Sequence, residues 1–87
     1  MFLMDNLSGT KIAVVAIIVS DFDAVENINA LLHTYSEHVI GRMGIPYKQK
    51  KVNVICVVLD APQETINALT GKLGMIKGVS SKVLTTK

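Results

Sequence analysis

The chain contains one strand-like segment twice. After Lys11 come the residues IAVVAIIV, after Lys51 come VNVICVVL, and the two segments match position by position at an offset of 40. A second pair, INALL at 28–32 and INALT at 66–70, matches at an offset of 38. Nearly unbroken runs of aliphatic, β-branched residues are typical of strands covered on both faces. The repeat therefore predicts one strand–helix unit that occurs twice.

The two predicted helices carry apolar residues at helical spacing. In the first helix, Ser20 is the predicted N-cap, and Asp23 three residues later completes a capping box. In the second helix, Asp60 is the predicted N-cap, with Pro62 in the first turn. The apolar stripes are Val25, Ile28, Leu31, Leu32 and Tyr35 in the first helix, and Ile66, Leu69, Leu73 and Ile76 in the second. Each stripe predicts a helix that packs on the sheet.

A more polar strand is predicted after each helix, at residues 37–43 and 79–86. The element order is then βαββαβ, and right-handed crossovers place the strands of the repeat side by side in the centre. This order predicts an α+β, ferredoxin-like sandwich, with a four-stranded antiparallel sheet of order 4-1-3-2 and two helices on one face. Residues 11–87 are predicted to form this single domain, and residues 1–10 a flexible N-terminal extension.

Both central strands are apolar on both faces, although two helices can cover only one of them. One face carries Ile12, Val14, Ala16, Ile18, Val52, Val54, Cys56 and Val58; the other carries Ala13, Val15, Ile17, Val19, Ile55, Val57 and Leu59, with Asn53 as its only polar residue. An uncovered face in an antiparallel sheet is normally polar, and a large apolar patch usually marks an interface. We therefore expect the chain to assemble with itself, as a dimer or tetramer, partly through this sheet face.

The composition argues against several functions that use this topology. The central strands contain no aromatic residue on which RNA bases could stack, and the acidic segment SDFD after the first strand would repel a phosphate. No nucleophile or acid–base pair stands out, so we predict neither an enzyme nor a cofactor. His33, His38 and Cys56 are only weak candidates for metal ligands, since no spacing such as H-x-H occurs. The single cysteine and the short apolar runs favour a cytoplasmic protein with no membrane or direct nucleic-acid partner.

The segment VIGRMGIPYKQKK at 39–51 interrupts a strand-like run with glycines. Glycine inside a strand marks either a bulge or the close approach of a ligand or another backbone, and an arginine offers a fork for an anionic group. The candidate ligand or interface residues are Gly41, Arg42, Met43, Gly44, Pro46 and Tyr47, with Thr70, Gly71, Lys72 and Gly74 as a second group. The alternative is purely structural: an edge-strand bulge and the end of a helix.

Three segments carry a family resemblance: VVAIIVSD, VIGRMGIPYKQKKVNVICVVLD and INALTGKLGMIKGVSSKVLTTK. Over residues 11–87 the chain resembles the iron-only ([FeFe]) hydrogenase system regulator family. The resemblance implies a ferredoxin-like fold similar to ACT domains and to the regulatory half of the nickel-responsive repressor, relatives that oligomerise and sense small ligands or metals. The chain departs from both patterns, because strand two offers only His38 and the loop after strand one lacks a glycine.

These observations favour a non-enzymatic, homo-oligomeric regulatory or small-ligand-sensing domain, linked to the iron-only hydrogenase system. No segment is left over to bind DNA, so such a regulator would act through a partner protein. Two alternatives stay open. One is a metal-binding sensor, and the other is a small dimeric α+β-barrel enzyme with a cavity between sheet and helices, for which Asn53 is nearly the only polar sheet residue.

Overall fold

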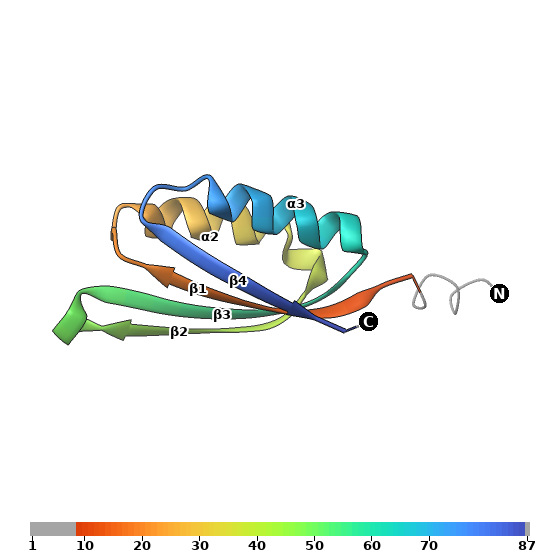
Figure 1. Ribbon diagram of the computed structural model, residues 1–87, viewed down its shortest axis with the longest axis horizontal. Helices are drawn as coiled ribbons and strands as arrows, with labels where there is room; N and C mark the ends of the chain where they lie inside the picture. The colour runs from red at the N-terminus through yellow and green to blue at the C-terminus, as the bar shows by residue number, and fades with distance from the viewer. Residues whose placement is uncertain (1–8, 87) are drawn as a thin grey trace.

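The computed structural model describes residues 9–86, which form one sheet and two helices (Figure 1). The strands are β1 (Lys11–Val19), β2 (Val39–Tyr47), β3 (Val52–Ala61) and β4 (Val79–Thr85). The helices are α2 (Ala24–Thr34) and α3 (Gln63–Gly74), with short 3-10 turns η1 (Ser36–His38) and η2 (Lys48–Lys50). The predicted extension at 1–10 lies outside the described residues except for its last two.

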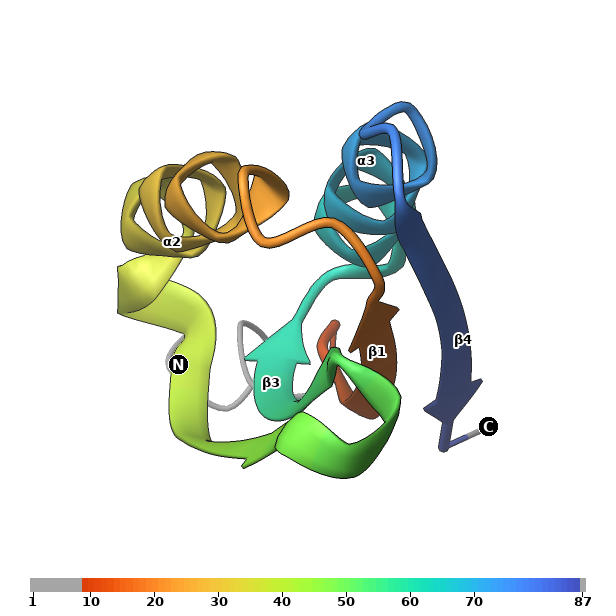
Figure 2. The ribbon, with the colours of Figure 1, turned by 90° about the vertical axis from the view of Figure 1, so that its left-hand side faces the viewer.

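The sheet has the strand order β2-β3-β1-β4, and every neighbouring pair is antiparallel. Both helices lie on one face, with α2 above the β2 side and α3 above the β4 side (Figure 2). The predicted α+β sandwich and the order 4-1-3-2 are thereby confirmed. Within residues 9–86, neither helix is long and apolar enough to cross a membrane.

The residues of β1 alternate strictly between the two faces of the sheet. Its helix-facing residues Ala13, Val15, Ile17 and Val19 are all fully buried. On β3 the helix-facing partners are Ile55, Val57, Leu59 and Ala61. The helices complete this core with Ala24, Ile28, Leu32, Ile66, Leu69 and Leu73. The predicted helical stripes are confirmed, because Val25, Leu31, Tyr35 and Ile76 also pack against this cluster.

Both predicted helix caps are wrong. The Ser20 hydroxyl donates to the carbonyl oxygen of Gly78 at 3.2 Å, and the Ser20 N–H donates to the same oxygen at 2.8 Å. Ser20 thus ties the end of β1 to the entry of β4 and is not available to α2. The Asp23 N–H instead donates to Asp21 Oδ1 at 3.0 Å, in the turn before the helix. Asp60 still belongs to β3, so that α3, which begins at Gln63, starts two residues later than a cap there would require.

Strand β2 runs farther than predicted, to Tyr47 instead of residue 43. Gly44, Ile45 and Pro46 pair with residues of β3, and an irregularity between Val39 and Gly41 leaves Ile40 as an extra, bulged residue. The prediction ended the strand early because glycine and proline are poor strand residues. An edge strand tolerates proline, since one side of its backbone needs no ladder hydrogen bonds.

Candidate functional site

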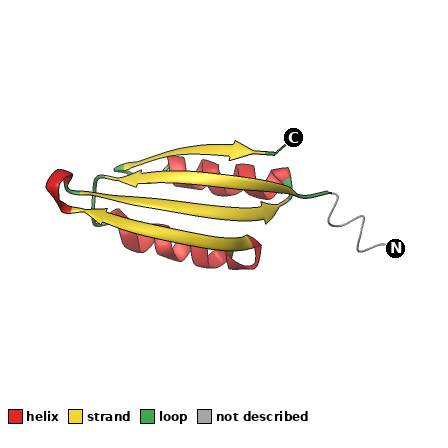
Figure 3. Ribbon diagram, turned by 90° about the horizontal axis from the view of Figure 1, so that it is seen from below, coloured by secondary structure: helices red, strands yellow, loops and turns green. Residues whose placement is uncertain are grey.

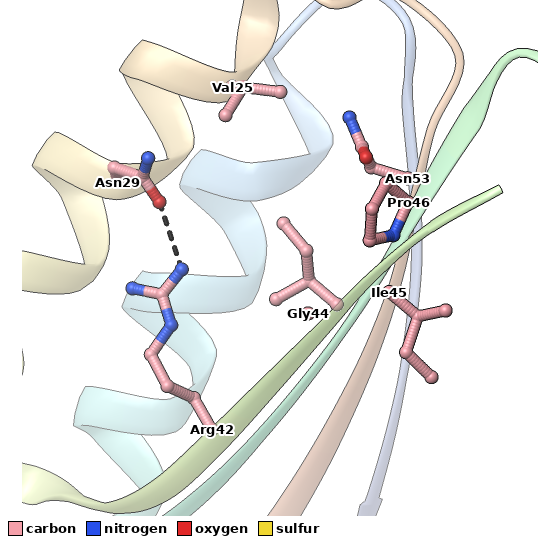
Figure 4. Close-up of a pocket in the computed structure, with 8 residues that line it drawn as sticks. Val25, Asn29, Arg42, Gly44, Ile45, Pro46 and Asn53 are labelled. Atoms are coloured by element: carbon pink, nitrogen blue, oxygen red, sulfur yellow. Dashed lines mark hydrogen bonds between the residues drawn. The ribbon is translucent and has the colours of Figure 1, made fainter. Parts of the chain in front are cut away.

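A groove separates α2 from the edge strand β2. Its volume is about 250 Å³, and the close-up in Figure 4 shows it open between the helix and the strand. The lining residues come from three elements and are Val25, Asn29, Arg42, Gly44, Ile45, Pro46, Asn53 and Ile55. We call this hollow the Arg42 groove.

The groove exists because β2 presents little bulk to the helix at its centre. Gly44 pairs with the helix-facing Ile55, so a side chain at position 44 would point into the groove. A Cβ built on Gly44 would have no atom within 4 Å. Among the described residues, nothing packs onto Gly44 that would require a glycine there. Its effect on the fold is to leave space.

Arg42 spans the groove from β2 to α2. Its Nη2–H donates to Asn29 Oδ1 at 2.9 Å, as the dashed line in Figure 4 shows. On the other side of this bridge lies a second hollow of about 220 Å³, which Asn29 and Arg42 also line together with Leu32, His33, Ser36 and Val39. The bridge therefore divides the space under α2 into two compartments.

The Arg42 groove is positively charged and contains hydrogen-bonding groups that the chain itself does not use. In the described part of the chain the one ion pair joins His38 to Glu37 at 4.0 Å, so the charge of Arg42 is not neutralised by a carboxylate. Asn53 stands on the otherwise apolar helix-facing side of β3. No hydrogen bond of its side chain is found within residues 9–86. One cation and two amides thus line a hollow with apolar walls.

The second notable surface is the sheet face that no helix covers, which Figure 3 presents to the viewer. The exposed residues of this face are mostly large and apolar: Ile12, Val14, Ile18, Met43, Ile45, Tyr47 and Leu84. Across it run the half-buried Val54, Cys56 and Val58 of β3. Its charged residues on the strands are Asp60 and Lys82. We call this surface the open face; it is apolar, as expected for central strands that are apolar on both faces.

A family model matches residues 11–83, and its description is TM1266-like, a proposed iron-only hydrogenase system regulator. The chain belongs to the TM1266-like family. Among solved structures, the uncharacterized protein TM1266 from Thermotoga maritima is similar to it, with 35% identity and a TM-score of 0.85 over 90% of this chain and 99% of that one. No curated protein matches the chain. The resemblance read from the sequence is confirmed.

In this member of the TM1266-like family, the glycine-containing segment of β2 faces two ways. Gly41, Met43 and Tyr47 pair with Val58, Cys56 and Val52 on the open face. Arg42, Gly44 and Pro46 alternate with them and line the Arg42 groove. The first predicted group of site residues is therefore divided between two surfaces, and the prediction did not distinguish them.

The second predicted group lies on α3, above the other half of the sheet (Figure 2). Lys72 Nζ donates to the Tyr35 hydroxyl at 3.0 Å and lies 5.2 Å from the centre of the Tyr35 ring. The Thr70 hydroxyl donates to the carbonyl of Asn67 at 3.2 Å. Gly71 and Gly74 have open space where a Cβ would stand. None of the four lines the Arg42 groove, and the contact of Lys72 joins the ends of the two helices.

The weak metal candidates are not brought together within one copy. Cys56 lies on the open face, whereas His33 lies on α2, on the other side of the sheet. Among residues 9–86, no group of three or more His, Cys, Asp or Glu could hold a metal ion.

Sequence reasoning missed half of the groove. Asn29 and Val25 were read only as helix residues, and Ile55 only as one of the apolar residues of the central strands. Asn53 carried a signal, because it is a polar residue in a strand whose other helix-facing positions are apolar. Asn29 carried none, since an exposed asparagine on a helix is ordinary.

Proposed function

We propose that this chain is a non-enzymatic, homo-oligomeric regulatory domain, which senses a small ligand, is linked to the iron-only hydrogenase system and acts through a partner protein. The observation that carries the proposal is the open face. The family description, a regulator and not an enzyme, supports it. So does the Arg42 groove, which offers binding groups but lacks an acid–base pair or a nucleophile in its lining.

The covering partner that best fits the open face is a second copy of the chain. Ile18 is 49% exposed, Met43 57% and Leu84 74%, which is unusual for one continuous sheet surface of a lone domain. The face has one acidic and one basic strand residue, Asp60 and Lys82, so two copies can meet without a block of like charges. Self-association through one shared patch is the commonest form of assembly.

The expected free energy of burial is sufficient for a stable assembly. A standard interface buries about 800 Å² on each partner. If half of that area is apolar, the two copies together remove about 800 Å² of apolar surface from water, which gives roughly 20 kcal/mol at about 25 cal/mol per Å². Association costs about 4–15 kcal/mol. A stable oligomer at micromolar concentration is the expected balance.

Native mass spectrometry combined with light scattering tests the assembly. We expect a defined dimer or tetramer for the unmodified chain and a monomer for Ile18→Glu, because a buried, unpaired carboxylate strongly opposes association. The variant should stay folded, since Ile18 faces solvent in the isolated chain. A stable monomer of the unmodified chain at micromolar concentration would contradict the proposal.

The regulatory part needs a test in a host that makes an iron-only hydrogenase. Replacing the chromosomal gene with one that encodes Ile18→Glu should change the level of hydrogenase activity. An unchanged level, in cells that contain normal amounts of the variant, would contradict the link to this enzyme system.

A further inference from the structure

The Arg42 groove has the features of a site for a small organic anion. We infer that it binds a small carboxylate with an apolar chain of a few carbons, with the carboxylate at Arg42 and the chain on Val25 and Ile55. This inference rests on the proposed sensing function and names the ligand class for it.

The first step of the argument is the state of Arg42. A guanidinium has five N–H donors, of which two in a row can grip a carboxylate. Asn29 takes one of them at 2.9 Å, and no carboxylate of the described chain neutralises the charge. The Asn29 bridge also holds the long side chain across the groove, as Figure 4 shows. A preorganised arginine loses less conformational freedom when it binds an anion.

The second step is the apolar surface beside the charge. Val25, Pro46 and Ile55 line the same hollow as Arg42. A volume of about 250 Å³, at about 30 Å³ for each water-sized unit, accommodates roughly eight non-hydrogen atoms. A six-carbon carboxylate has this size. An inorganic anion would leave the apolar walls uncovered.

The third step is the space at Gly44. Its Cβ position is empty to 4 Å, and almost any other residue there would stabilise an edge strand better than glycine does. Gly44 lies on β2 between Arg42 and Pro46, and Pro46 pairs with Asn53 of β3. A side chain at position 44 would therefore fill the hollow between Arg42 and Asn53. A glycine that the fold does not need is consistent with a position kept open for a guest molecule.

The lining also sets the class of anion. It contains no Asp or Glu that could hold the ammonium group of an amino acid. It contains one cation, whereas phosphate sites usually combine several cationic or backbone N–H donors. Both considerations favour a simple carboxylate over an amino acid or a phosphate.

The test is a titration of the ¹⁵N-labelled full chain, monitored by two-dimensional NMR, with hexanoate and with its neutral analogue hexanamide. We expect hexanoate to shift the amide signals of Gly44, Ile45 and Asn53 in a saturable manner. Hexanamide should bind at least tenfold more weakly, because it lacks the charge. Equal binding of the two, or no saturable shift with hexanoate, would overturn the inference. So would tighter binding of leucine or of inorganic phosphate than of hexanoate.

Two glycines of β2 provide a matched pair of variants. Gly44→Val fills the groove and should abolish the hexanoate shifts. Gly41→Val adds the same side chain three residues away, at a position that pairs with Val58 on the open face and also has no atom within 4 Å. It should leave hexanoate binding unchanged. Arg42→Lys keeps the charge but loses the fork, and should weaken binding at least tenfold. Retained binding in Gly44→Val would overturn the inference.

The hexanoate titration and the assembly test can fail independently of each other. A monomeric chain that binds hexanoate would refute the proposed oligomer and leave the groove assignment in place. An oligomer that ignores hexanoate would refute the groove assignment alone.

Discussion

Ile17 and Ile18 are identical, adjacent residues on opposite faces of β1, and truncating each to alanine separates folding from assembly. Ile17 is fully buried in the core, whereas Ile18 is 49% exposed on the open face. Replacing isoleucine by alanine removes three carbons, which costs about 2.4 kcal/mol at about 0.8 kcal/mol per buried carbon. At Ile17 the cavity left behind raises the total cost to about 3–5 kcal/mol of unfolding free energy.

At Ile18 the same truncation leaves no enclosed cavity, and only about half of the side chain is buried within the folded chain. Its cost to the isolated chain is therefore about 1.2 kcal/mol. The other half would be buried in the interface of each copy, so that a symmetric dimer loses about 2.4 kcal/mol. This corresponds to a dissociation constant raised about 60-fold. Both variants lose similar strand propensity, which cancels in the comparison.

The assays are urea unfolding monitored by circular dichroism and sedimentation velocity over a range of protein concentrations. Several concentrations are needed because assembly itself stabilises the folded chain. Ile17→Ala should lower the unfolding free energy most, and Ile18→Ala should raise the dissociation constant most. A dissociation constant that Ile18→Ala leaves within a few-fold of the original would refute the open face as the interface. A cost at Ile18 equal to that at Ile17, measured on the monomer, would refute the assignment of the two faces.

Further predictions concern individual contacts of the fold. Gly78→Ala should destabilise the chain by about 2–4 kcal/mol, because Gly78 has φ +81° and an added Cβ would lie 2.5 Å from that of Asp21. Gly71→Ala in α3 meets open space and should stabilise it by about 0.5–1 kcal/mol. In thermal unfolding, an unchanged or raised melting temperature for Gly78→Ala, or a lowered one for Gly71→Ala, would contradict the prediction for that variant. Tyr35→Phe removes the acceptor of Lys72 but keeps the ring, and should cost less than about 1 kcal/mol. A larger loss in urea unfolding would show that this contact does more than join the helix ends.

The architecture could be predicted because the signals for it are long and repeated. The alternation of β1 over nine residues and the helical stripes each depend on many side chains at once. The errors fell where one or two contacts decide the outcome. Ser20 has the right chemistry for a helix cap, but the carbonyl of Gly78, distant in sequence, takes its hydroxyl. No local pattern contains that information.

The candidate site was predictable only in part, for a related reason. Arg42 and Gly44 stood out because a strand with glycine and arginine at its centre is unusual. The groove also needs α2 to stand above them, with Asn29 placed to accept the Arg42 hydrogen bond. That juxtaposition depends on how a helix packs over an edge strand, which sequence spacing does not specify. Hence the prediction named the strand that lines the groove, but it missed that alternate residues of this strand lie in the Arg42 groove and on the open face.

The alternation along β2 gives the proposed sensor a simple physical means of coupling. Arg42 and Gly44 face the groove, while Met43, between them, faces the surface where a second copy would bind. A ligand that shifts this short segment therefore changes the position of an interface residue without any longer path through the protein. By thermodynamic reciprocity, a carboxylate that alters the dimer dissociation constant by some factor must itself bind the dimer and the monomer with affinities that differ correspondingly. A ligand that binds both forms equally would occupy the groove and regulate nothing. Measuring the dissociation constant of the dimer with and without saturating hexanoate thus decides between a sensor and a passive binding site.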